Sequence, residues 1–202
     1  MGDNSPRDPV VDLLEQAIAQ MGDIIAVITP DQAAWPTPCE NWPVRRLIDH
    51  VIGQILRDFT VSARGEMPAW GAPADAVGDD WAAEFATRAQ PLLDQWRTAD
   101  LDRLVPGMGG EAPLRGRADQ QIAEFAMHAW DLTRATGQGR ALEPDLAEHA
   151  LAWSRQVLKP EYRGQGRAFG PEWPIPADAP AYDRLAAWFG RDPGWTPGPD
   201  QN

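Results

Sequence analysis

Residues 119–137 read Asp-Gln-Gln-Ile-Ala-Glu-Phe-Ala-Met-His-Ala-Trp-Asp-Leu-Thr-Arg-Ala-Thr-Gly, and this stretch decides the fold class. Apolar residues recur along it at the three- and four-residue steps of an amphipathic helix. They are Ile122, Phe125, Ala126, Ala129 and Leu132. Gly137 follows as a natural helix C-cap. The stretch therefore predicts a long helix over residues 119–136.

The same periodicity predicts other helices over 9–28, from Trp42-Pro43 through Phe59, over 79–98, over 144–158 and, more briefly, over 181–189. Pro91 lies inside the third of these and is expected to kink or break it. Residues 105–118 read as irregular, without a convincing strand. The fold class expected is all-α, a four-helix bundle over residues 1–160 with a Gly/Pro-rich extension over 161–202 that packs on it. The long 65–78 connection suits a crossover between helices that are not antiparallel neighbours.

Composition narrows the function classes. The formal net charge of −12 disfavours binding to nucleic acid and to anionic membranes. No apolar run is long enough to span a bilayer, and the polar start has no secretory signal, so we expect a cytoplasmic protein. Cys39 is the single cysteine, which excludes an internal disulfide and a multi-cysteine zinc site. We expect a structural role for it.

The histidines point to a candidate metal site. Glu124 and His128 lie four residues apart and share one helix face, and Asp131 follows on the same stripe. His50 lies on a different predicted helix, and bundle metal sites are commonly built from facing helices. Two imidazoles and one carboxylate suit zinc, with nickel, iron and manganese as alternatives, and leave a coordination position for water or a thiolate.

A simpler reading of these residues stays open. Glu124, His128 and Asp131 lie opposite the apolar stripe of their helix, where a solvated polar face would look the same. His50 is at the edge of its own apolar stripe rather than at its centre. His149 is interpreted as an ordinary flanking histidine of the 144–158 helix.

Two segments resemble a known family. Residues 37–53, Thr-Pro-Cys-Glu-Asn-Trp-Pro-Val-Arg-Arg-Leu-Ile-Asp-His-Val-Ile-Gly, are similar to the start of the second helix in mycothiol-dependent maleylpyruvate isomerases. Residues 124–137 resemble that family's signature E-x-x-x-H-x-W-D-L-x-R-A-T-G. The resemblance implies a DinB-like four-helix bundle in which His50, Glu124 and His128 bind zinc. Asp131 would then orient a ligand from behind the site or form a polar wall.

The resemblance also implies an activity. Mycothiol, bound to the metal as a thiolate, would attack an electrophilic carbon of a small substrate, for isomerisation or thiol transfer. The alternatives are a metal-dependent hydrolase that uses no thiol and a non-catalytic metal-binding or stress-response protein.

The C-terminal segment resembles the ending of uncharacterised actinobacterial proteins, whereas the full isomerase carries a larger C-terminal domain. Arg184 and Arg191 of this segment either hold an anionic substrate or make surface or inter-element ion pairs. A second copy of the chain, giving a homodimer, is one candidate partner for the segment.

Overall fold

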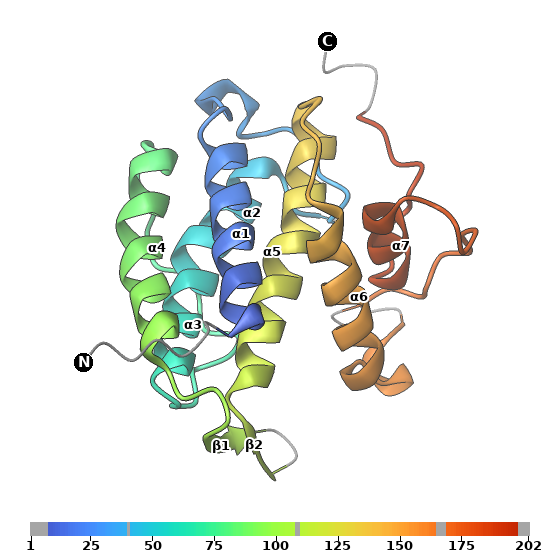
Figure 1. Cartoon of the computed structure of the whole chain (residues 1–202). Coiled ribbons are helices and arrows are strands. Elements are labelled where there is room, and N and C mark those ends of the chain that lie inside the picture. Colours follow the sequence, from blue (N-terminus) through green and yellow to red (C-terminus); the bar gives the residue numbers. More distant parts are fainter. Residues whose placement is uncertain (1–7, 40, 108–109, 165–168, 198–202) are drawn as a thin grey trace.

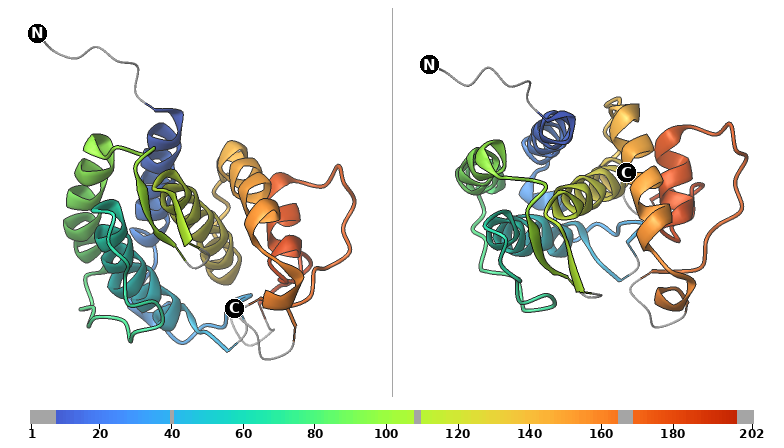
Figure 2. Two further views of the ribbon diagram at one scale, coloured as in Figure 1. Left: turned by 90° about the horizontal axis from the view of Figure 1, so that it is seen from below. Right: turned by 60° about the horizontal axis from the view of Figure 1, so that its bottom comes forward.

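The computed structural model describes residues 8–39, 41–107, 110–164 and 169–197 (Figure 1). Four helical stretches form the bundle. They are α1 (Pro9–Ile25), a continuous stretch made of α2 (Val44–Asp49), η2 (His50–Ile55) and α3 (Leu56–Ala63), then α4 (Trp81–Thr98) and α5 (Arg115–Thr136). α1 packs against α4 and α5, and α3 packs against the same two helices, so the four-helix bundle expected from the sequence is confirmed (Figure 2).

Local sequence explains where these helices begin and end. The Asp8 carboxylate accepts a hydrogen bond of 3.0 Å from the backbone N–H of Val10, and Pro9 occupies the first helical position of α1. Asp80 caps α4 in the same way, through the N–H of Ala83 at 3.1 Å. At the end of α5, Gly137 adopts the left-handed conformation with φ of 65°, which confirms its predicted capping role.

The core runs along the middle of the bundle and draws on each of its helices. Its largest fully buried side chains include Leu14, Met21, Ile24, Leu47, Ile52, Phe59, Leu92, Trp96 and Phe125. α5 lies at the centre, because α1 and α3 contact one side of it and α6 (Pro144–Val157) the other. Almost every residue from Ala118 to Ala135 is consequently buried or half-buried. The central helix is therefore shielded on several sides, which matters for the polar residues that it carries.

Residues 64–80 join α3 to α4 and are called here the crossover connection. Arginines from three helices donate hydrogen bonds to its backbone carbonyls: Arg45 to Val77 at 2.5 Å, Arg57 to Pro73 at 2.8 Å and Arg88 to Ala76 at 3.1 Å. The long crossover expected from the sequence is thus fastened to the bundle by charged donors.

The C-terminal part follows α6 and contains η3 (Pro160–Tyr162) and α7 (Ala181–Trp188). α7 packs on α6 and also reaches α5, forming an added layer on one side of the bundle (Figure 2). Two contacts connect it with the bundle helices. The Gln20 side-chain amide donates to the Tyr182 hydroxyl at 2.8 Å, and Trp130 Nε1 donates to Asp183 at 3.2 Å.

Three local expectations were wrong. Residues 104–113 form an antiparallel hairpin of β1 (Leu104–Gly107) and β2 (Gly110–Pro113), with Leu104 opposite Pro113. α5 begins at Arg115 rather than at residue 119, because the Arg115 backbone N–H donates to Leu101 and its guanidinium binds Asp8. α4 continues through Pro91, which is exposed, so water can hydrate the carbonyl that the proline leaves unbonded.

No helix in the described ranges is both long enough and apolar enough to cross a membrane.

Candidate metal centre

The structure brings His50, Glu124 and His128 together. One ligand atom from each lies within 4.8 Å of the others, and among the described residues this is the group that could hold a metal ion. His50 comes from η2, and the other two come from successive turns of α5. The imidazole rings of His50 and His128 meet edge to face, with centroids 5.2 Å apart. The three residues selected from the sequence therefore share one site.

Each histidine is held from behind through its Nδ1 atom. His128 Nδ1 lies 3.1 Å from a carboxylate oxygen of Asp131, and His50 Nδ1 lies 2.9 Å from the amide oxygen of Gln54. Both partners are hydrogen-bond acceptors, so both Nδ1 atoms carry the proton and both Nε2 atoms keep a lone pair. His128 Nε2 faces Glu124 at 3.5 Å. The ligand atoms thus point at one another before any ion is bound.

Burial separates this arrangement from an ordinary polar surface. His128 is 6 % exposed and Asp131 is 0 % exposed, so the interpretation of a solvated face is wrong for these two residues. The helical wheel could not reveal this, because neighbouring helices cover α5 on more than one side. The Glu124 side chain keeps 34 % of its surface exposed. Access from solvent is therefore on the glutamate side of the site.

The charges are arranged so that the histidines differ. Burial, reinforced by the nearby His128, lowers the pKa of His50 to about 4, so this ring is neutral at neutral pH. Burial also opposes the charged form of His128, but the carboxylates of Asp131 and Glu124 outweigh it and raise the pKa of His128. Burial by itself raises the pKa of Glu124, yet the hydrogen bond from His128 lowers it overall. Both carboxylates are therefore ionised.

Arg191 of the C-terminal segment completes the site from the opposite side. Its guanidinium Nη2 lies 3.2 Å from the carboxylate of Asp131, and the two side chains are 12 % and 0 % exposed. Asp131 is thus bound between a histidine and an arginine. Arg191 makes the inter-element pair considered in the sequence, whereas Arg184 binds Glu148 and the carbonyl of Ala179 away from the triad.

Two neighbours of His50 were not singled out from the sequence. Trp42 contacts the His50 ring edge to face at 4.9 Å, and the Arg46 guanidinium lies 4.6 Å from the centre of the indole. Gln54 is the other. Its place four residues after His50 is the only sequence signal, and glutamines at that distance on a helix are too common for the signal to be specific.

The remaining cysteine and histidine are accounted for separately. Burial raises the pKa of the Cys39 thiol to about 11, so Cys39 is a neutral thiol at physiological pH. His149 is more than a flanking residue, because its Nε2 lies 2.8 Å from Asp119 of α5. That pair links α6 to α5 and does not include any residue of the triad.

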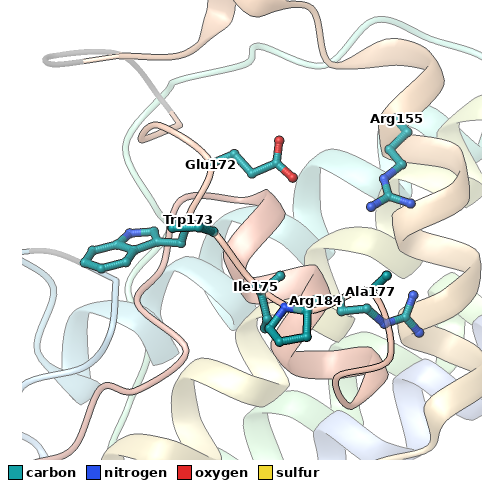
Figure 3. Close-up of a pocket in the computed structure, with 8 residues that line it drawn as sticks. Arg155, Glu172, Trp173, Ile175, Ala177 and Arg184 are labelled. Carbon is teal, nitrogen blue, oxygen red and sulfur yellow. The ribbon is translucent and has the colours of Figure 1, made fainter.

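A cavity of about 400 Å³ lies elsewhere, between α6, α7 and residues 172–177 (Figure 3). Arg155, Glu172 and Arg184 contribute its charged groups. None of its lining residues belongs to the triad, and the Arg184 guanidinium is already bonded to Glu148. We therefore assign the candidate chemistry to the triad rather than to this larger hollow.

The donor set fits a divalent ion. Zinc ligands lie about 2.0–2.2 Å from the metal, so two atoms on one ion are at most about 4.4 Å apart. The observed limit of 4.8 Å requires only small side-chain rotations to reach that value. Neutral imidazole nitrogens with an ionised carboxylate are ligands that zinc and similar ions accept. Asp131 and Gln54 supply the outer hydrogen bonds that usually accompany metal-binding histidines.

Comparison with known proteins gives a consistent family. The model of the mycothiol maleylpyruvate isomerase N-terminal domain matches residues 14–133. Uncharacterised proteins from Mycobacterium tuberculosis strains H37Rv and CDC 1551 are each 34 % identical over 180 residues, covering 83 % of this chain and 90 % of theirs.

Solved structures support the same fold. The crystal structure of the mycothiol-dependent maleylpyruvate isomerase superposes with a TM-score of 0.59, covering 96 % of this chain and 83 % of that one at 16 % identity. A variant of that enzyme with one histidine replaced by alanine gives 0.60. The superposed share is large enough to reach past the bundle into the C-terminal segment. By the matched family model and its relatives, this chain belongs to the mycothiol maleylpyruvate isomerase N-terminal domain family.

Proposed function

We propose that this protein binds one divalent metal ion through His50, Glu124 and His128 and uses it with mycothiol on a small electrophilic substrate. The observation that carries the proposal is the convergence of three ligand atoms from two helices, with both histidines held by acceptors at Nδ1. Family membership supports the thiol, because the matched domain is described by its relation to mycothiol. Zinc is the ion that this donor set favours, with nickel, iron and manganese as alternatives.

The metal would supply a Lewis acid that favours the thiolate form of a thiol at neutral pH. The rest of the site falls to the residues of the chain. Asp131 and Gln54 hold the two imidazoles in the protonation state that presents Nε2. Arg191 neutralises the buried Asp131 and adds positive charge beside Glu124. The exposed edge of Glu124 leaves a path for a small molecule to approach.

The chain's own thiol is a poor substitute for an external one. Cys39 is the single cysteine, and its pKa of about 11 leaves almost no thiolate at neutral pH. A thiol-dependent reaction at this site therefore requires a small thiol from solution. This supports the role of mycothiol over catalysis by a protein cysteine.

Metal content tests the first half of the proposal. We expect elemental mass spectrometry to find about one ion per chain in tag-free wild-type protein and none in His128→Ala. His149→Ala is the matched control, since His149 pairs with Asp119 outside the triad, and it should keep its metal. A wild type that takes up no zinc when zinc is offered would refute the metal site.

A titration with mycothiol tests the second half. Calorimetry on the metal-loaded wild type should give saturable binding that His128→Ala lacks. Retention of metal without any binding of mycothiol would refute the thiol while leaving the metal site intact.

A further inference from the structure

The helix that carries His50 changes its hydrogen-bond pattern at that residue. Residues His50–Ile55 form a π-helical turn between α2 and α3. Such turns are rare, insert one extra residue per turn and recur at functional sites. Here the turn leaves the Gly53 carbonyl available to a group outside the helix, and the Asp75 backbone N–H donates to it at 3.1 Å.

The crossover connection packs tightly against this turn. A Cβ atom on Gly53 would lie 2.4 Å from the Asp75 carbonyl oxygen, so only glycine allows the connection to approach this closely. Arg57 holds the same segment through the carbonyl of Pro73 at 2.8 Å and the Asp75 carboxylate at 2.9 Å. The turn that aims His50 is therefore fixed by a segment distant in sequence.

Gln54 connects this support to the imidazole. Its amide oxygen lies 2.9 Å from His50 Nδ1, and its other end lies against Asp58. Asp58 is 2 % exposed and is held by Arg57 Nε at 3.0 Å. A carboxylate only accepts hydrogen bonds, so the amide NH₂ must face Asp58 and the amide oxygen must face His50. The orientation of the amide, and with it the protonated nitrogen of His50, follows from Asp58.

We propose that Gln54 is a positioning residue, which holds His50 in the Nδ1-protonated tautomer and so keeps Nε2 free for the metal. The chain of contacts runs from the crossover connection through Arg57 and Asp58 to Gln54 and His50. The inference rests on the proposed function for the identity of the bound group. Gln54 does for His50 what Asp131 does for His128, but with a neutral acceptor, so the His50 ring gains no negative neighbour at Nδ1.

The tautomer is measurable without metal. Long-range ¹⁵N–¹H NMR spectra of the metal-free wild type should show the proton of His50 on Nδ1. Gln54→Met removes the acceptor at similar volume, so His50 should shift toward the Nε2-protonated form. Gln54→Glu restores an acceptor oxygen and should retain the Nδ1-protonated form. Proton on Nε2 in the wild type, or an unchanged tautomer in Gln54→Met, would overturn the proposal.

Zinc affinity gives the second measurement, by competition with a chromophoric chelator. We expect Gln54→Met to weaken zinc binding by about 10–100-fold, as loss of such an outer hydrogen bond typically does. Gln90→Met is the matched control, because Gln90 makes the same four-residue contact, with Asp94 at 3.0 Å, on the exposed side of α4. Equal affinities in Gln54→Met and Gln90→Met would refute the role of Gln54.

The outcomes separate this inference from the proposed function. A wild type that binds no zinc would refute the metal site, while the NMR spectra would still decide whether Gln54 sets the tautomer. If Gln54→Met does not fold, Asp58→Asn replaces it. An asparagine can accept or donate, so the Gln54 amide could then turn over and His50 should populate both tautomers. A single Nδ1-protonated form in Asp58→Asn would contradict the proposed chain of contacts.

Discussion

The two helices that supply the triad aim their ligands in different ways. α5 is regular over its 22 residues, and ordinary four-residue spacing brings Glu124 and His128 to one face. The second helix changes to a π turn at His50 and needs the crossover connection against Gly53 to hold it there. Two ligands on one helix require only its own geometry, whereas a ligand from another helix depends on contacts between distant segments.

The supports behind the two histidines also differ in charge. His128 is held by the ionised Asp131, which the buried Arg191 of the C-terminal segment neutralises. His50 is held by the neutral amide of Gln54. A buried ion pair is costly to break because it leaves an unpaired charge, while a neutral hydrogen bond costs less. Disrupting the α5 side should therefore destabilise the protein more than disrupting the His50 side.

The largest effect is expected from Asp131→Asn. The substitution keeps the shape of the side chain but leaves the Arg191 guanidinium, 12 % exposed, without its charged partner. We expect the free energy of unfolding to fall by about 3–5 kcal/mol. Chemical denaturation with a chelator present measures this, since metal binding then makes no contribution.

The double variant Asp131→Asn/Arg191→Leu is the control for that experiment. Removing the arginine as well abolishes the unpaired buried charge, so the double variant should be more stable than Asp131→Asn alone. A double variant as unstable as the single one would mean that the ion pair is not the cause.

An intermediate effect is expected from Gly53→Ala. The new methyl group would lie 2.4 Å from the Asp75 carbonyl oxygen, so the crossover connection or the π turn must move. We expect a loss of about 1–3 kcal/mol in the free energy of unfolding, as for other overpacked sites. Zinc affinity should fall as well, because the turn positions His50. Thermal unfolding and chelator competition measure the two effects.

Gly116→Ala provides the matched control on α5. A Cβ there has no atom within 4 Å beyond its own helix, so the substitution should raise helix stability by about 0.5–1 kcal/mol. If Gly53→Ala were as stable as Gly116→Ala, the close approach of the crossover connection to η2 would be wrong.

The smallest effect is expected from Tyr182→Phe in the C-terminal segment. The change removes the hydroxyl that accepts a hydrogen bond from the Gln20 amide at 2.8 Å and leaves this buried N–H group without that partner. We expect a loss of about 1 kcal/mol in the free energy of unfolding. An unchanged denaturation midpoint would show that the contact between α7 and α1 adds nothing to stability.

The same residue gives a dependence on pH. Burial raises the pKa of Tyr182 to about 12, above the ordinary tyrosine value of 10.0. The folded state then keeps a proton that the unfolded state loses, so stability should fall as pH rises from about 10 toward 12. Tyr182→Phe should show a shallower decline over this range. Urea titrations at several alkaline pH values would detect the difference, and equal slopes would contradict it.

Much of the bundle could be predicted from the sequence, because apolar periodicity and caps are local. The ends of α5 at Gly137 and of α7 near Gly190 follow from glycine alone. The hairpin at 104–113 could not be predicted, because Pro106 and Pro113 are poor strand formers and most of its residues are exposed. Its register comes from pairing between the two strands rather than from an apolar pattern.

The sequence by itself determined which residues could bind a metal. A glutamate and a histidine four apart on a helix must share a face, and His50 was the remaining histidine on a facing helix. Only the tertiary structure decided that these polar groups are buried together, because burial depends on which helices cover α5. It also decided the π turn, the orientation of the Gln54 amide and the arrival of Arg191. Each of these depends on contacts between segments far apart in the chain, which no local pattern encodes.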